Sequence, residues 1–406
     1  MKIGILTYHY AYNFGANLQV LSTVCRLRRQ GYDPLVINWR PSDVMDRYRR
    51  ETQESQSATH EKFICDHLPL STVCHTSDDI AKVIDQDGID AVIIGSDAVL
   101  NIDAKSYFSI RQFRRVHSPN RTSVHVVPNP FWGTFLERTR KPTPCLMMSA
   151  SSQDANFKCM TNQERQRAAV CLKRLCLITV RDTWTKKMIS WITDGKCDPE
   201  ITPDPVFAFN QNVPLRLTDE SVLQRFDLPK KYILLSFKKS PPVVSKWVNA
   251  FSELATAMGY TCVAFPYPQE LNTFSLKHQV NLPLSPLEWY AIIKNASGYV
   301  GHNMHPVITC IHNVVPFHSF DNYGMVARWF SNTKTSKIYD LLSRTGLGEY
   351  TSSVNGRTPV LKTPQDVLNS LINFDRRKCT AAGAIMLTRY EDMMNRVEST
   401  IDSFNL

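Results

Sequence analysis

Short apolar runs alternate with segments of helical periodicity along the first half of this chain. The run at residues 2–7 is followed by a polar turn, and apolar residues then recur near helical spacing over residues 18–27. Later apolar runs end in small or polar residues, at residues 91–94, 145–148 and 177–180. Strands of this kind are buried on both faces, so the alternation predicts a parallel sheet with helices on both sides.

The same alternation restarts after a segment rich in proline, residues 203–214, which we interpret as a linker. Ser285 is expected to cap a helix, because a proline follows it directly and a glutamate lies three residues after it. Further strands are predicted at residues 232–236, 262–265 and 298–300. We therefore expect a second α/β unit in this half of the chain.

This restart sets the predicted domain limits. We predict an α/β fold with two Rossmann-like domains, residues 1–210 and 211–375, that face each other across a cleft. Residues 376–406 carry one apolar stripe and should form an amphipathic helix that crosses back to the first domain. Residues 103–144 break the rhythm with five prolines, so we expect an excursion there: a long loop, a lid or a substrate-binding insertion.

The composition is that of an ordinary folded protein, since 43% of the 406 residues are hydrophobic and 21% are charged. No apolar run approaches the ~18 residues that a membrane helix needs, and the apolar stretch after Met1 is too short for a signal peptide. We therefore expect a cytoplasmic location. The 11 cysteines form no CxxC pair, which favours reduced thiols over disulfides or a zinc site.

The formal net charge is +10. Arginines gather at residues 26–29, 47–50 and 111–115. These clusters are either solvated helix faces or a surface that attracts anionic ligands or the inner face of a membrane. No nucleic-acid-binding module is recognisable, so nucleic acid is not an expected partner.

The turn that precedes the helix at residue 307 carries the most reactive side chains. It follows a buried strand, so we expect it to face the cleft. Four histidines lie in or near it, but no acidic residue or cysteine joins them at ligand spacing, so no metal site is expected. His302, His312 and His318 also suit a protein core. His305 is the candidate for proton transfer, because imidazole titrates near neutral pH.

Polar motifs follow the predicted strands in a characteristic order. They are residues 4–7 with 13–19, 93–97, 178–182, 204–205, and 299–305 with 315–317. Together they resemble the polysaccharide pyruvyl transferases over roughly residues 1–345.

The resemblance implies a fold similar to the GT-B architecture of one glycosyltransferase class. It also implies transfer of pyruvate from phosphoenolpyruvate, as co-substrate and without a cofactor, to a sugar of a surface polysaccharide or its lipid-linked precursor. The product would be a cyclic ketal, for instance on galactose, and phosphate would be released.

The resemblance also implies residue roles on the donor side. The histidine of the family pattern falls on His305, as general acid, and its strand-tip arginine falls on Arg181. Asn303 and Pro306 stand where the pattern has Ser or Arg and Gly, so one expected positive charge is missing. His302 or Lys238 could supply this charge. The expected donor-binding residues are Arg181, Lys238, His302 and Asn303.

Neutral polar groups of the first domain suit the hydroxyls of a sugar acceptor. The expected acceptor-binding residues are Asn13, Gly15, Asn17, Gln19, Gly95 and Ser96. Gly15 is expected at a sharp turn that needs positive φ. Asp97 is the second catalytic candidate, as a base toward a hydroxyl, and a helix N-cap is its structural alternative.

Local roles are equally open for several other residues. Arg181 could pair only with Asp182 or Asp204, and Lys238 could lie in a solvated loop. Trp132 could stack on a sugar ring or anchor the core.

Two other functions remain open. A glycosyltransferase with a nucleotide-sugar donor would usually carry a glutamate pattern in its second domain, but no acidic residue follows His305 until Asp321. A non-catalytic binding protein on the same fold is favoured by the departures at Asn303 and Pro306.

Overall fold

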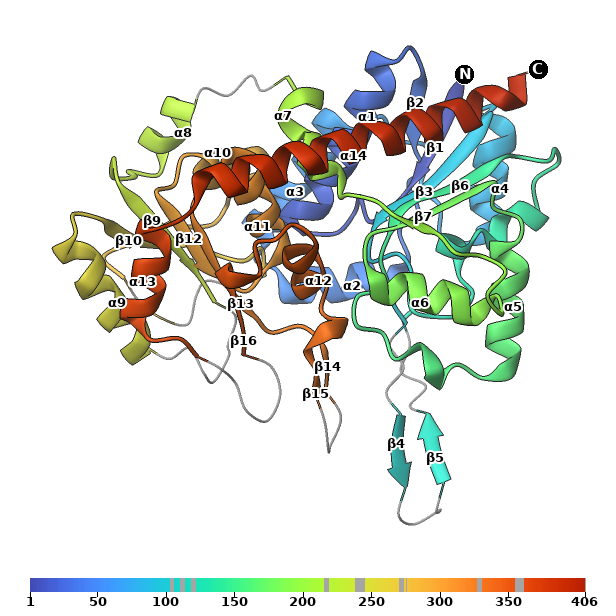
Figure 1. The fold of residues 1–406 in the computed structure, drawn as a ribbon. Helices are drawn as coiled ribbons and strands as arrows, with labels where there is room; N and C mark the ends of the chain where they lie inside the picture. Colours follow the sequence, from blue (N-terminus) through green and yellow to red (C-terminus); the bar gives the residue numbers. More distant parts are fainter. Residues whose placement is uncertain are drawn as a thin grey trace.

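Two parallel sheets organise the chain in the computed structural model (Figure 1). The structure describes residues 1–102, 106–109, 114–117, 122–214, 219–237, 245–269, 274, 276–326, 331–354 and 361–405. Each sheet has six strands and is covered by helices, which confirms the prediction of two Rossmann-like α/β domains. The predicted division between residues 210 and 211 falls within α7 (Phe209–Asn212), between the two sheets.

The first domain contains the sheet β2-β1-β3-β6-β7-β8, in which every neighbouring pair is parallel. Its strands are β1 Lys2–Leu6, β2 Asp33–Val36, β3 Ala91–Asp97, β6 Cys145–Ala150, β7 Leu177–Val180 and β8 Glu200–Ile201. Its helices are α1 Phe14–Arg29, α2 Ser42–Glu51, α3 Glu54–His67, α4 Ser77–Gln86, α5 Asn162–Leu172 and α6 Thr183–Ile192. The central strands are buried along their whole length, as their uninterrupted apolar character predicts.

The second domain repeats this arrangement with the parallel sheet β11-β10-β9-β12-β13-β16. Its strands are β9 Tyr232–Ser236, β10 Thr261–Ala264, β11 His278–Gln279, β12 Gly298–Gly301, β13 Phe317–Asp321 and β16 Thr351–Ser353. Its helices are α8 Asp219–Arg225, α9 Ser245–Ala257, α10 Pro286–Lys294, α11 Met304–Asn313, α12 Lys337–Arg344 and α13 Pro364–Ile372. Ser285 caps α10 through a reciprocal hydrogen-bond pair with Glu288, as expected.

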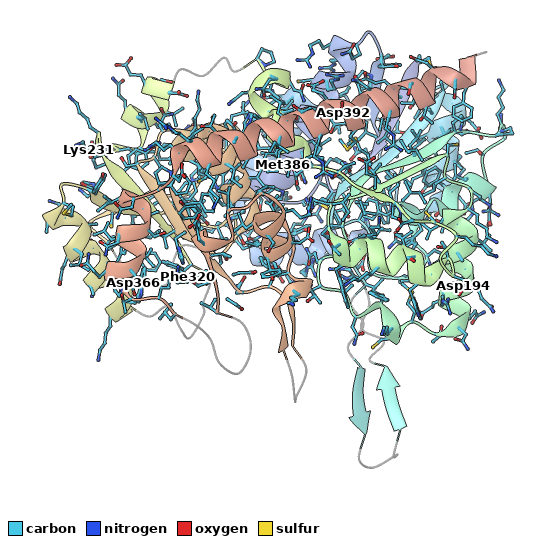
Figure 2. The ribbon with its side chains drawn as sticks, viewed as in Figure 1. Asp194, Lys231, Phe320, Asp366, Met386 and Asp392 are labelled. Atoms are coloured by element: carbon cyan, nitrogen blue, oxygen red, sulfur yellow. The ribbon has the colours of Figure 1, made fainter. Side chains whose placement is uncertain are left out.

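The long helix α14 (Arg376–Asp402) runs from the second domain across to the first, as predicted (Figure 1). Met386 and Asp392 mark its course in Figure 2. Arg26 of α1 pairs with Glu391 and with Glu398, the latter at 2.8 Å. Burial alone would lower the pKa of Arg26, but the two glutamates outweigh it and raise the pKa. The helix is therefore held to the first domain by charge as well as by its apolar stripe.

The two domains also share a hydrophobic core. Phe14, in the first turn of α1, stacks on Trp289 of α10 with ring centroids 5.5 Å apart. Buried residues of α1, α10, α11 and α14 belong to one continuous cluster. This packing holds the domains in the orientation that shapes the space between them.

The excursion at residues 103–144 has two parts. An antiparallel hairpin, β4 (Ser106–Ser109) with β5 (Arg114–His117), projects from the first domain (Figure 1). The later part packs into the domain, where Trp132 is fully buried. Trp132 is therefore a core residue and does not face a sugar. No helix in the described ranges is both long and apolar enough to cross a membrane.

Candidate active site

A cavity of about 430 Å³ lies between the domains, at the carboxyl ends of both sheets. Open α/β sheets bind ligands at this edge, because the strand ends and the following loops converge there. Both domains contribute polar side chains to its wall. They include Asn13, Arg47, Tyr48, Asp97, Asn101, His125, Gln153, Tyr267, Gln269, Asn303, His305, Tyr323 and Lys337.

His305 reaches this cavity from the first turn of α11, and its side chain is 12% exposed. The imidazole packs against Gly15 of α1, from the other domain. A Cβ on Gly15 would lie only 2.0 Å from Nδ1 of His305. The expectation of a positive φ at Gly15 is wrong, since Gly15 lies inside the helix. A glycine is needed there because the histidine ring occupies the place of its side chain.

Asp204 stands behind His305. Its Oδ2 lies 3.6 Å from Nε2 of His305 and accepts hydrogen bonds from Arg181 Nη1 at 2.6 Å and Gln19 Nε2 at 2.5 Å. Burial alone would raise the pKa of Asp204, but His305 and the Arg181 guanidinium outweigh it and hold this pKa well below its usual range. The imidazole therefore faces a buried, ionised carboxylate.

Arg181 follows β7 and is 5% exposed. Besides Asp204, its Nη2 lies 3.6 Å from Oδ1 of Asp97. Burial would lower the pKa of Arg181, but the charges of these aspartates and of Asp182 raise it. The guanidinium does not line the cavity. The positive charge expected for a donor is thus used mainly to neutralise aspartates.

Lys337 supplies a cation on the wall of the second domain. It is the first residue of α12, whose N-cap Ser336 accepts from the backbone amides of Ile338 and Tyr339. The Lys337 Nζ lies 4.7 Å from the centre of the Tyr323 ring, and the Tyr323 hydroxyl donates to Oδ1 of Asn303 at 3.3 Å. Lys337 and Asn303 therefore both contact the Tyr323 side chain.

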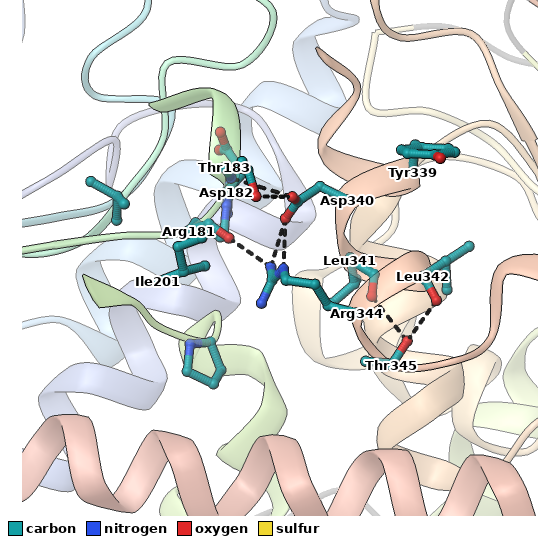
Figure 3. Close-up of polar contacts among 12 residues, drawn as sticks. Arg181, Asp182, Thr183, Ile201, Tyr339, Asp340, Leu341, Leu342, Arg344 and Thr345 are labelled. Carbon is teal, nitrogen blue, oxygen red and sulfur yellow. Dashed lines mark hydrogen bonds and ion pairs between the residues drawn. The ribbon is translucent and has the colours of Figure 1, made fainter. Parts of the chain in front are cut away.

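Helix α12 is tied to the first domain one turn after Lys337 (Figure 3). Asp340 accepts from the amide and hydroxyl of Thr183, and Arg344 donates to Asp340. Arg344 also donates to the backbone oxygen of Arg181 at 3.1 Å. The helix that carries Lys337 is thus fixed relative to Arg181.

The sequence model of the polysaccharide pyruvyl transferase family matches residues 13–323. The chain belongs to this family. No curated protein matches the sequence.

Solved structures of other enzymes share the two-domain GT-B fold of this pyruvyl transferase family member. A putative UDP-N-acetylglucosamine 2-epimerase from Listeria monocytogenes has a TM-score of 0.52 at 10% identity, over 94% of this chain and 90% of its own. MnaA of S. aureus, solved with UDP, has a TM-score of 0.50 at 10% identity, with the same coverages of 94% and 90%. UGT89C1 of Arabidopsis thaliana has a TM-score of 0.50 at 9% identity, over 100% and 99%. At such identities the likeness establishes the fold alone.

The structure separates the donor-side predictions for this family member. Asn303 lines the cavity next to His305, as expected. His302 does not: it is fully buried, its Nδ1 lies 2.7 Å from the Phe320 backbone oxygen and its ring packs edge-on against Phe237. His302 is a core residue, which corrects the expectation of donor binding. Lys238 lies outside the described residues.

The acceptor-side predictions divide in the same way. Asn13 caps α1 by accepting from the Ala16 amide and also lines the cavity. Asn17 is fully buried, donates to the His9 backbone oxygen and lies 2.8 Å from Nδ1 of His60. Gln19 is 1% exposed and turned toward Asp204. Both expectations of sugar contact are therefore wrong, because these amides serve buried hydrogen bonds.

The Gly-Ser-Asp tip of β3 puts only its aspartate into the cavity. Gly95 has φ +115°, and a Cβ there would lie 2.3 Å from the Met148 backbone oxygen. Ser96 is buried, and its backbone oxygen accepts from the Thr7 hydroxyl. Gly95 and Ser96 therefore shape the tip, and neither is among the residues that line the cavity. Asp97 caps none of the described helices.

The other histidines near the turn are structural. Burial lowers the pKa of His312 to about 4 and that of His318 to about 3. Within the part of the chain that the structure describes, no three His, Cys, Asp or Glu side chains are grouped to hold a metal ion.

Sequence reasoning missed Lys337 and Tyr323. It noted Arg47 only within a basic cluster, and it gave Asp204 no role beyond a family motif and a partner for Arg181. Ser336 before Lys337 is a visible helix N-cap signal, and 204–205 was among the family motifs. Arg47 lies on α2, with its guanidinium carbon 5.5 Å from the centre of the Tyr48 ring. Nothing local indicates that α2 lines the cavity.

Proposed function

We propose that this protein transfers pyruvate from phosphoenolpyruvate to a sugar of a polysaccharide precursor. The product is a cyclic ketal across two hydroxyls, and phosphate leaves. One observation carries the proposal: His305, backed by Asp204, and Lys337 line the same cavity between the domains. Family membership supports the reaction class.

The donor binds against the second domain. Phosphoenolpyruvate carries a carboxylate and a phosphate, which favour a buried ammonium group and the amino end of a helix. Lys337 supplies the ammonium, α11 supplies the helix end beside His305, and Asn303 supplies an amide. Lys337 takes the place of the cation that Asn303 lacks.

The reaction needs an acid that protonates a carbon atom of phosphoenolpyruvate. The His305 imidazolium gives its proton to the methylene carbon of phosphoenolpyruvate, and the central carbon becomes electrophilic. The oxygen of one sugar hydroxyl bonds to that carbon and gives its proton to the Asp97 carboxylate, from which the imidazole is reprotonated. The second hydroxyl then displaces phosphate, which departs with that hydroxyl's proton.

The acceptor lies on the side of the first domain. Asp97, Asn13 and Gln153 offer polar groups to sugar hydroxyls, and the Tyr48 ring offers an apolar face. A volume of about 430 Å³ is within the range of small-molecule sites. The net charge of +10 favours a lipid-linked acceptor at the inner face of the membrane.

Purified full-length protein tests the proposal. It is incubated with phosphoenolpyruvate and lipid-linked galactosides, and phosphate release and the mass of the glycan are measured. We expect one ketal-linked pyruvate per phosphate, lost in His305→Ala and kept in the control His278→Ala on edge strand β11. Product formation only with a nucleotide sugar would favour glycosyl transfer. If no donor gives a product, a non-catalytic binding protein would be favoured.

A further inference from the structure

Three side chains converge on a single carboxylate oxygen beneath the cavity. Oδ2 of Asp204 accepts from Gln19 and Arg181, and Nε2 of His305 lies 3.6 Å away. The other oxygen, Oδ1, accepts from the Val206 backbone amide at 3.0 Å. The position of this carboxylate is therefore fixed from three directions before any ligand binds.

Asp204 is 1% exposed, so water does not screen its charge. Arg181 is the nearest cation, but Asp97 shares it at 3.6 Å. Two carboxylates thus face one guanidinium. Lys337 and Arg344 border the same buried space from α12. Asp182 accepts hydrogen bonds from the Ser151 hydroxyl and the Thr185 amide.

We propose that Asp204 is the positioning residue for His305. It accepts from Nε2–H, so Nδ1 is the nitrogen that carries the proton delivered into the cavity. A separation of 3.6 Å is long for a hydrogen bond, but catalytic hydrogen bonds often shorten only when the substrate binds. The kinetic consequences of this inference rest on the proposed function. The orientation of the His305 ring does not depend on that function.

A purely structural role for Asp204 is the competing explanation, because it also caps the 3₁₀ turn Pro205–Ala208 and holds Arg181. The two roles differ in what Asp204→Asn should do. An amide keeps the shape and an oxygen for Val206, but it has no charge with which to retain a proton on His305. A structural role would alter stability without altering how the rate depends on pH.

The kinetic test compares pH profiles of kcat. For Asp204→Asn we expect kcat at pH 7.5 to fall by about 10²-fold, the KM for phosphoenolpyruvate to stay within about threefold, and the alkaline limb to move to lower pH. Asp204→Glu keeps the charge, so the alkaline limb of its pH profile should stay at the wild-type pH. The matched control Asp182→Asn removes another buried carboxylate beside Arg181 and should also leave the limb there. An unmoved limb in Asp204→Asn would overturn the proposal.

A second measurement needs no activity and does not use a variant of Asp204. Nitrogen-15 NMR of the wild-type protein, with the His305 signals assigned by their absence in His305→Ala, reports which ring nitrogen keeps the proton in neutral imidazole. We expect Nε2–H for His305. Nδ1–H would overturn the inference about Asp204, even if pyruvyl transfer is observed. Nε2–H without any turnover would leave that inference standing while the proposed function fails.

Discussion

Gly15 and His305 come from different domains and touch: a Cβ at Gly15 would overlap the imidazole, 2.0 Å from Nδ1. The contact places the candidate general acid against the first turn of α1. It also makes the geometry of the site depend on how the two domains pack, since neither domain alone positions the ring.

Gly15→Ala should therefore disable the enzyme more than it unfolds it. The methyl group must displace the imidazole from its position, and we expect kcat to fall by at least about 10²-fold at a stability cost of about 1–3 kcal/mol. Gly348→Ala is the control, because a Cβ there meets no atom within 4 Å. Steady-state kinetics and urea unfolding check both values. Turnover in Gly15→Ala equal to that of the control would show that the contact is unimportant.

Lys337→Met should weaken donor binding. Loss of the buried ammonium removes a charge-assisted contact with the donor anion, so we expect the KM for phosphoenolpyruvate to rise by about 10-fold or more. Lys337→Arg keeps the charge and should recover part of the affinity. Lys246→Met, on the exposed side of α9, controls for general loss of charge. An unchanged KM in Lys337→Met would exclude Lys337 from the donor site.

The buried histidines should make the protein sensitive to acid. Burial lowers the pKa of His60 to about 3, from an ordinary value of 6.5. The unfolded chain therefore binds this proton more readily, and stability present above pH 6.5 is lost as pH falls toward 3. His60→Gln should have a flatter dependence of Tm on pH below 6.5 than the wild type. The exposed His75→Gln is the control, and equal slopes in all three proteins would contradict the prediction.

Arg26→Ala should loosen the hold of α14 on the first domain. The substitution leaves Glu391 and the mostly buried Glu398 without their partner. Breaking a buried ion pair from one side costs about 3 kcal/mol. Urea unfolding measures this, with Arg28→Ala as control because Arg28 lies two residues on and is exposed. A loss no larger than in the control would mean that the apolar stripe of α14 suffices.

The fold was predictable because its signals are local. The apolar runs at 91–94 and 145–148 lie within buried central strands, and Ser285 caps α10 as its neighbours indicate. Strand burial and helix capping depend on residues a few positions apart, so they can be recognised in one sequence without knowledge of what packs across them.

Residues of the candidate site could be predicted only where they lie at the carboxyl end of a strand or in the turn after it. His305, Asn303 and Asp97 follow strands whose carboxyl ends face the cavity, so position along the chain sufficed to place them. Asn17 and Gln19 occupy an equally promising stretch, yet both are buried. Whether a polar side chain meets a ligand or a buried partner depends on the side of the helix from which it extends and on the element packed there.

The sequence by itself therefore determined two α/β domains, the crossing C-terminal helix and a polar turn at His305 that faces the cavity, because periodicity and strand-tip position are properties of neighbouring residues. Only the tertiary structure decided three further contacts. Asp204 lies next to His305, the imidazole occupies the space where a side chain on Gly15 would lie, and Lys337 lines the cavity. The contacts of His305 with Asp204 and with Gly15 join residues that are 101 and 290 positions apart. They exist because the carboxyl ends of two sheets meet at one cavity, which no local pattern records.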